Sequence, residues 1–216
     1  MKVMNKIKTS LLILFSLSCF GGWAQNMPLG MTISGLGLNF CSYSTSSTNL
    51  CTLDKITGSL SGTNVNASYS YAVLYKFLIT GKIDYTAYTG GIGSFDFTAG
   101  GEYHVSYFGH KKPPVDIYLD FNFGYTHLNV ESNSVSSTGI FNASGICAGF
   151  GAILCKYFSN NIGIFIDANF DVHHYNGGEV AVPDEGKNPY SLTLSGFNYG
   201  FGLCKRFGSK VHPLID

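Results

Sequence analysis

Charged residues are scarce in this chain of 216 residues. They make up 12% of the sequence, whereas a soluble domain usually carries about 25%. A surface with so little charge needs a partner or lipid to cover it. The chain also lacks a basic tract that could bind nucleic acid and a charge run typical of a disordered tail, so we expect no nucleic-acid partner.

Long apolar runs are missing after Phe20. No later stretch approaches the roughly 20 apolar residues of a membrane-spanning helix. The early run Leu11–Phe20 follows three lysines and precedes Gly22-Trp23-Ala24, which is the layout of a signal peptide. We predict a signal peptide over residues 1–24, cleaved after Ala24. Acylation of Cys19 is the alternative, although Ser16 stands where lipoprotein signals usually carry an aliphatic residue.

Once the predicted leader is removed, the chain has no tryptophan and an odd number of cysteines. The mature chain of 192 residues has 10 basic and 13 acidic side chains, a net charge of −3, and no tryptophan. Its five cysteines are an odd number, so at least one thiol is free or bonded to another chain. Cys41 and Cys51 could form a disulfide in an oxidising compartment. Cys147 and Cys155 lie about 26 Å apart along one strand and are expected to be packing residues.

What the sequence has instead is alternation of apolar and polar residues with a period of two. In Val115–Tyr125 every odd-numbered residue is apolar or aromatic and most of the even-numbered ones are polar. Successive side chains of a strand point to opposite faces. Strands of about 9–11 residues with an apolar outer face and a polar inner face are what a transmembrane β-barrel requires.

The same pattern predicts eight strands. They are expected at Met31–Tyr43, Ala67–Thr80, Ile83–Tyr88, Ser94–Tyr107, Val115–Val130, Gly145–Phe158, Ile162–Tyr175 and Ser191–Phe207. Leu192 and Leu194 predict a bulge near Ser195-Gly196, because they are out of phase with the aromatic residues that follow. Residues 44–66, 131–141 and 176–189 would form long external loops, which alternate with short periplasmic turns.

The run from Gly145 to Phe207 resembles the last three strands of small OmpA/OmpX-like outer-membrane barrels, which end in an aromatic strand with a final Phe. Phe207 matches that position, although Gly208–Asp216 continues beyond it. The resemblance implies an all-β fold, a closed eight-stranded antiparallel up-and-down transmembrane β-barrel, over residues 25–207 with a short extension at 208–216. It also implies location in the outer membrane of a Gram-negative cell envelope, in contact with the lipopolysaccharide leaflet.

The alternation assigns side chains to the two faces of the barrel. The polar network expected in the lumen comprises Lys76, Asp96, Glu102, His104, Asp116, Asp120, Asp167, Asp171 and Arg206. The lipid-facing set comprises Phe95, Phe97, Ile117, Leu119, Phe121, Phe123, Ile164, Ile166 and Phe201. Because an eight-stranded barrel is filled by its own side chains, we expect a structural network of ion pairs and no open channel, in preference to a gated or proton-conducting pore.

Three histidines are the remaining candidates for a metal site or a catalytic site. Asp171 and His173 share a face but His174 points away, and two ligands are too few to hold a divalent ion, so no metal and no cofactor is expected. His127 faces outward, where a lipid-modifying enzyme would need a serine beside it, and its neighbours along the strand include none. We therefore expect no enzymatic activity.

The predicted function is that of a monomeric integral outer-membrane protein with a structural or surface-interaction role, working through loops rich in Ser, Thr, Asn and Gly. One alternative is a soluble secreted lipocalin-like barrel or β-sandwich, which would line its interior with the apolar set. A second alternative is a lipid-modifying enzyme, which requires a His–Ser pair within hydrogen-bond distance on the outer wall.

Overall fold

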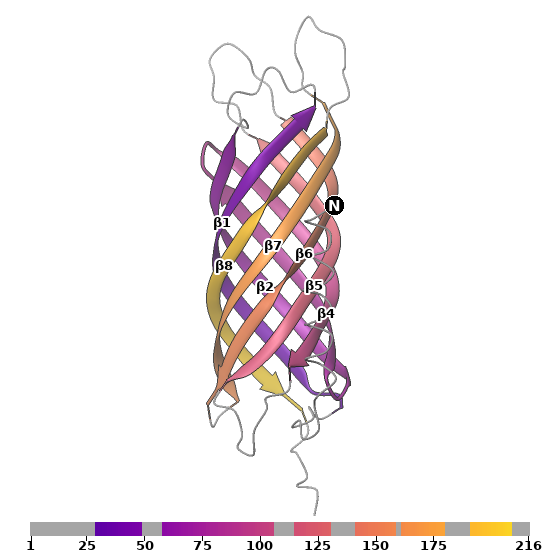
Figure 1. The fold of residues 1–216 in the computed structure, drawn as a ribbon, viewed down its shortest axis with the longest axis vertical. Helices are drawn as coiled ribbons and strands as arrows, with labels where there is room; N and C mark the ends of the chain where they lie inside the picture. The colour runs from indigo at the N-terminus through magenta and orange to yellow at the C-terminus, as the bar shows by residue number, and fades with distance from the viewer. Residues whose placement is uncertain are drawn as a thin grey trace, which may run out of the picture.

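The chain forms a closed antiparallel barrel of eight strands (Figure 1). The computed structural model describes residues 29–48, 58–105, 115–130, 141–158, 161–179 and 191–208. The strands are β1 (Thr32–Thr48), β2 (Ser59–Leu74), β3 (Phe77–Tyr88), β4 (Ile92–Val105), β5 (Asp116–Val130), β6 (Phe141–Tyr157), β7 (Ile162–Glu179) and β8 (Ser191–Phe207). The predicted fold class is confirmed. In the described ranges no helix is long and apolar enough to cross a membrane.

Closure of the barrel joins the first strand to the last. β1 pairs with β8 in an unbroken register from Thr32 opposite Phe207 to Thr48 opposite Ser191. No strand edge is therefore left unpaired, as a barrel within lipid requires. The positions of the first and last strands distinguish the two ends of the barrel. We call the end that holds the start of β1 and the end of β8 the periplasmic end, and the opposite one the external end.

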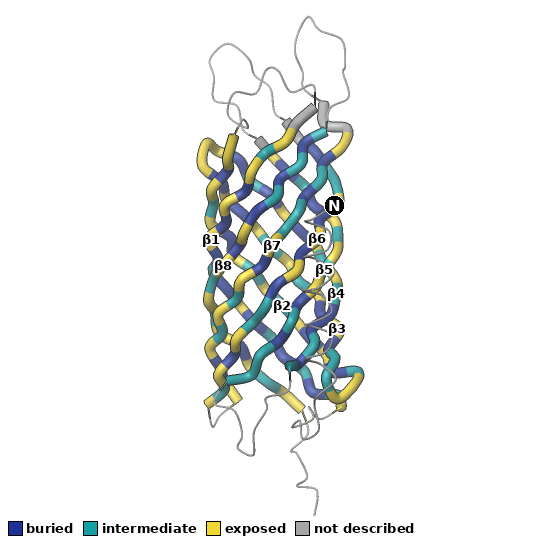
Figure 2. The backbone as a smooth tube through the Cα atoms, in the orientation of Figure 1, coloured by how far each residue is buried: buried dark blue, intermediate teal, exposed yellow. Residues whose placement is uncertain are grey.

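The outer wall is apolar and the inner wall is largely polar. Figure 2 shows buried and exposed residues alternating along each strand. In β5, Phe121, Phe123 and Tyr125 are exposed, whereas Asp120 and Thr126, which flank them along the strand, are fully buried. A lipocalin-like protein would have the reverse arrangement, so the interior polarity contradicts that alternative.

The predicted boundaries of the second and third strands were wrong. The expected strand Ala67–Thr80 contains the end of β2, a turn at Tyr75-Lys76 and the start of β3, and β2 begins at Ser59 inside the expected first loop. The pairing of β2 with β3 shifts at a bulge between Ala72 and Leu74, and this extra residue together with the two-residue turn preserves the parity of the alternation. Tyr71 and Ile79 are therefore both exposed on either side of the turn. The pattern therefore continues through the turn without a break, and no Gly, Asn or Pro marks the turn.

Two further predictions about the strands were wrong. β8 has no bulge at Ser195-Gly196, because its register with β1 and with β7 is continuous there. Leu192 and Leu194 instead point inward in phase with the rest of the strand and are buried. The external end also carries a tight connection, residues 89–91 between β3 and β4, so long and short connections do not alternate strictly.

Several expectations fall outside the described residues. These are the leader at 1–24, acylation at Cys19, the partner Cys51, the residues 209–216 of the C-terminal extension, and most of the connections at 131–140 and 180–190. They stay predictions.

Candidate functional site in the barrel interior and on its outer wall

Two apolar clusters close the interior, one near each end. The external cluster contains Tyr43, Tyr88, Leu128, Tyr175 and Leu194, together with Cys41, Leu60, Ile92, Ala143 and Leu192. The periplasmic cluster contains Met31, Ile33, Ala72, Leu78, Tyr118, Cys155 and Cys204. Because these clusters come from opposite ends of the strands, the polar side chains in the middle of the barrel lie between two apolar groups.

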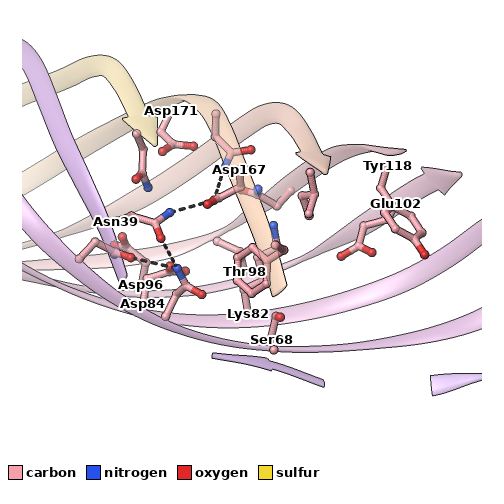
Figure 3. Close-up of a pocket in the computed structure, with 18 of the residues that line it drawn as sticks. Asn39, Ser68, Lys82, Asp84, Asp96, Thr98, Glu102, Tyr118, Asp167 and Asp171 are labelled. Atoms are coloured by element: carbon pink, nitrogen blue, oxygen red, sulfur yellow. Dashed lines mark hydrogen bonds between the residues drawn. The ribbon is translucent and has the colours of Figure 1, made fainter. Parts of the chain in front are cut away.

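The middle layer is strongly acidic. Five carboxylate residues line its cavity: Asp84, Asp96, Glu102, Asp167 and Asp171. A sixth, Asp120, is paired with Lys82 in the same layer. Among the described residues, Lys82 is the one lysine or arginine that lines the same cavity. The cavity that remains between these side chains measures about 90 Å³, enough for several water molecules. Figure 3 shows the carboxylates converging on this space.

Lys82 on β3 forms the central ion pair. Its Nζ lies 2.5 Å from Asp120 Oδ2, and the two side chains are 14% and 0% exposed. Asn122 donates a hydrogen bond to the same Asp120 oxygen at 3.2 Å. The sequence pattern placed Lys76 in this network, but Lys76 lies in the turn between β2 and β3, where its carbonyl accepts from His104 N. Lys82 takes the inner position because β3 extends further than the alternation suggested.

Neutral side chains bind the remaining carboxylates. Asn39 donates to Asp167 at 2.8 Å, as drawn in Figure 3, and Ser70 and Thr80 each donate to Glu102 at 3.0 Å. Tyr43 donates to Asp171 at 3.2 Å, and Thr126 donates to Asp96. Buried charges require such partners because an unpaired one is costly. The amides and hydroxyls thus share the stabilisation of an acidic layer that one lysine cannot neutralise.

A second charged group lies near the periplasmic cluster. Arg206 Nη2 donates to Asp116 Oδ2 at 2.8 Å, and His104 Nε2 is 3.2 Å from Asp116 Oδ1. The Arg206 guanidinium also stacks over Tyr157, 3.7 Å from the ring centroid. The structure therefore separates the predicted set into two groups: the acidic middle layer, and this cluster of Asp116, Arg206 and His104 at the periplasmic end.

The predicted lipid-facing set lies on the outer wall. Ile117 and Leu119, close to the periplasmic end of β5, are half-buried, and the other seven members are exposed. Phe97 and Phe95 stack edge to face on β4 with centroids 4.7 Å apart. This wall supplies the apolar band that a bilayer requires.

Three side chains of the middle layer could contribute to a metal site. Ligand atoms of Asp96, Cys147 and His173 lie within 4.8 Å of one another. His173 Nδ1 is 3.7 Å from Asp96 Oδ1. Asp96 and Cys147 lie beside His173 in this group in place of Asp171, and His174 faces outward, 2.9 Å from Thr193 Oγ1. Three ligands are one fewer than a closed structural zinc site contains.

A pair of thiols meets inside the periplasmic cluster. Cys155 Sγ on β6 and Cys204 Sγ on β8 are 3.0 Å apart. They approach each other across β7 at Gly163, where an added Cβ would lie 2.8 Å from Cys204 Sγ. The sequence suggested only packing for Cys155, because the strand that brings Cys204 to it is 49 residues away.

On the outer wall, the structure supplies the serine that the sequence around His127 lacks. His127 on β5 is directly opposite Ser144 on β6, and His127 Nδ1 lies 3.0 Å from Ser144 Oγ. The register between the two strands, not the sequence neighbourhood of His127, produces this pair.

No protein-family model matches the sequence, and no curated protein matches it. Solved structures do match the fold. The outer membrane protein OprG from Pseudomonas aeruginosa aligns with a TM-score of 0.58 at 13% identity, covering 87% of this chain and all of OprG. The outer membrane protein AlkL, solved in lipid bilayers, aligns with a TM-score of 0.53 at 10% identity, covering 91% of this chain and 98% of AlkL.

These similarities and the distribution of side chains define the class of protein. The chain is a closed β-barrel, apolar outside and polar inside, and its fold is similar to that of solved barrels of the outer membrane. The identities are too low to transfer any activity or ligand from those proteins.

Proposed function

We propose that this protein has a structural or surface-interaction role in the outer membrane, as a monomeric barrel that holds external loops and conducts no solute. One observation carries the proposal. The acidic layer is enclosed by apolar side chains at both ends, and Leu78, Leu128 and Leu194 in these clusters are 0% exposed. A pore requires a continuous polar path, and two apolar layers interrupt it.

The composition of the external segments supports a role in surface interaction. Residues 131–140 read Glu-Ser-Asn-Ser-Val-Ser-Ser-Thr-Gly-Ile. Hydroxyl and amide side chains provide adaptable hydrogen bonding, which suits recognition of a polar surface better than binding of an apolar ligand. Membrane lipid, including the lipopolysaccharide leaflet, is the partner of the wall itself.

Conductance of the purified protein in planar lipid bilayers tests the closed interior. We expect no steady conductance from the wild-type protein. Leu128→Ser and Leu194→Ser remove part of the external cluster, and Leu78→Ser removes part of the periplasmic one. A variant that carries all three changes should have a higher conductance. Steady single-channel steps from the wild-type protein would contradict a closed barrel.

Epitope tags test the orientation on which the surface role depends. A tag inserted in residues 131–140 should bind antibody on intact cells, and a tag in residues 108–114 should bind it only after the outer membrane is permeabilised. The opposite labelling would place the Ser-rich segment on the periplasmic side and would remove the basis for surface interaction. Electrophoretic mobility before and after boiling confirms that each tagged barrel is folded.

A further inference from the structure

The His127–Ser144 pair belongs to a three-residue polar cluster on the outer wall, near the external end. Tyr125 and His127 alternate with the buried Thr126 and Leu128, so both face outward. Tyr125 Oη donates a hydrogen bond to Ser144 Oγ at 2.7 Å, and His127 Nδ1 lies 3.0 Å from the same oxygen. The pairing of β6 with β7 slips between Asn142 and Ser144, and irregularities of this kind often redirect a side chain beside an active site.

The hydrogen bonds around Ser144 suit a nucleophile and its base. Ser144 Oγ accepts from Tyr125, so its own proton is free to be donated to His127 Nδ1 when the imidazole carries its proton on Nε2. A hydroxyl within hydrogen-bond distance of an imidazole is the arrangement that activates serine for attack on a carbonyl. Ser144 and His127 are both partly exposed, so a substrate can reach them from the membrane.

A groove of about 410 Å³ lies beside His127 at the external ends of β3, β4 and β5. Its outward-facing lining includes Tyr85, Ala87, Phe95, His127 and Asn129. Pockets that bind small molecules measure about 300–1,000 Å³ and are mostly apolar. Aromatic walls with an amide at the rim match an acyl chain joined to a polar head, and the external end of the barrel faces the outer leaflet.

We propose that Ser144 and His127 form a nucleophile–base pair that hydrolyses acyl esters of outer-leaflet lipids. Ser144 Oγ forms a bond to the ester carbonyl carbon, while its proton passes to His127 Nδ1. The carbon–oxygen bond to the lipid alcohol then breaks, and that alcohol leaves with the proton from His127. Water completes the cycle: it attacks the acyl-serine, gives a proton back through His127 to Ser144, and releases the fatty acid.

Tyr125 is a positioning residue in this scheme, since it contacts Ser144 and not the ester. Its hydrogen bond selects the Ser144 rotamer that faces His127. Among the described residues no carboxylate bonds to His127, so the pair works without the acidic third member of a triad. Tyr125→Phe should therefore lower kcat about tenfold and leave KM unchanged, whereas a loss of folding alone would lower the amount of active protein and leave kcat per folded barrel unchanged.

A second cross-strand pair provides a matched control. His174 Nδ1 on β7 lies 2.9 Å from Thr193 Oγ1 on β8, directly opposite in the register. This pair has the same hydrogen bond, but its hydroxyl is on a branched carbon and its histidine does not line the groove that His127 lines. The two pairs therefore differ in the features that the proposal requires.

The test uses the full-length mature protein refolded in detergent micelles. Fatty-acid release is measured from two substrates in separate arms, purified lipopolysaccharide and phosphatidylethanolamine, and the arm that is hydrolysed identifies the source of the ester. A long-chain fluorophosphonate serves as a covalent probe of Ser144, read by mass spectrometry. Boiling-dependent gel mobility is recorded for each variant to count only folded barrels.

We expect release of fatty acid in at least one arm and labelling of Ser144 in the wild-type protein. Ser144→Ala should abolish both, His127→Asn should reduce the rate at least 100-fold, and His174→Asn and Thr193→Ser should leave it unchanged. No release in either arm, or a rate that Ser144→Ala leaves intact, would overturn the proposal. Equal losses from His127→Asn and His174→Asn would do the same.

Discussion

The ion pair of Lys82 and Asp120 allows the stability of the acidic interior to be tested quantitatively. At a separation of 2.5 Å and an effective dielectric constant near 20, the attraction is about 6–7 kcal/mol before desolvation. Desolvation of two buried ions costs several kcal/mol each, so the pair contributes little net stability. Removing one partner is different, because it leaves a buried charge uncompensated at a cost of about 3–5 kcal/mol.

Lys82→Met should therefore lower the free energy of unfolding by about 3–5 kcal/mol. The five carboxylates that line the cavity increase the effect, since no other lysine or arginine among the described residues lines it. Adding Asp120→Asn to Lys82→Met should restore at least half of the loss, because the buried charge disappears. Lys156→Met, which removes an exposed lysine of β6, should change stability by less than about 1 kcal/mol.

The measurement does not depend on tryptophan fluorescence, since the one tryptophan of the sequence, Trp23, lies in the predicted signal peptide. Equilibrium unfolding in urea, with the barrel in lipid vesicles, is followed by the fraction that keeps its folded gel mobility without boiling. Equal stability of Lys82→Met and Lys156→Met would refute the reasoning. So would a double variant that is no more stable than Lys82→Met alone, because the loss would then come from packing of the lysine stem and not from charge.

Three further changes test the wall, the packing and the thiols. Phe123→Lys, at the centre of β5 on the exposed face, should lower stability in vesicles by about 2–4 kcal/mol, while Phe123→Leu should be nearly neutral in the same assay. Gly124→Ala should destabilise the barrel by about 1–3 kcal/mol, because the added Cβ would overlap the Phe97 carbonyl. Gly81→Ala should leave the stability unchanged, because the space around Gly81 is open. Mild oxidation should join Cys155 to Cys204, shown by loss of two titratable thiols and of none in Cys204→Ser; unchanged thiol counts would contradict the contact.

The fold could be predicted from the sequence wherever the alternation had clear limits. β8 has the bounds that the sequence predicts, and β5 and β7 start within one residue of their predicted starts. The largest errors in strand bounds fell between residues 44 and 88, where a bulge between Ala72 and Leu74 and a two-residue turn together kept the parity of the pattern. No Gly or Pro marks that turn. The number of strands was still right, because one strand was predicted too late and the next too short.

The interior was harder to predict than the faces. Alternation shows that a side chain points inward, but it does not show which inward side chains meet. Lys82 and Asp84 were missed because they lay beside a boundary that was misplaced. The apolar clusters were missed for another reason: Leu192 and Leu194 were interpreted as out of phase, although an eight-stranded barrel can fill its narrow ends with apolar side chains as well as polar ones.

The outer-wall pair shows the limit of reasoning along a single strand. The neighbours of His127 along β5 include no serine. Ser144 is 17 residues away and becomes a neighbour only through the register of β5 with β6. Register follows from the length of the connection at residues 131–140 and from the match of apolar faces, so a sequence pattern with a period of two cannot identify the partner.

The small size of the interior cavity also limits where any activity can occur. The cavity of about 90 Å³ has no room for a lipid, so a substrate must approach from the bilayer or from the external end. The groove beside His127 lies in that region, and the acidic layer does not. Ser144→Ala should accordingly abolish ester hydrolysis while leaving conductance, gel mobility and urea stability unchanged. Lys82→Met should lower stability and leave the rate per folded barrel unchanged. If either change altered both properties, the interior and the outer wall would be coupled, and the barrel could not be an inert support for a reaction at its surface.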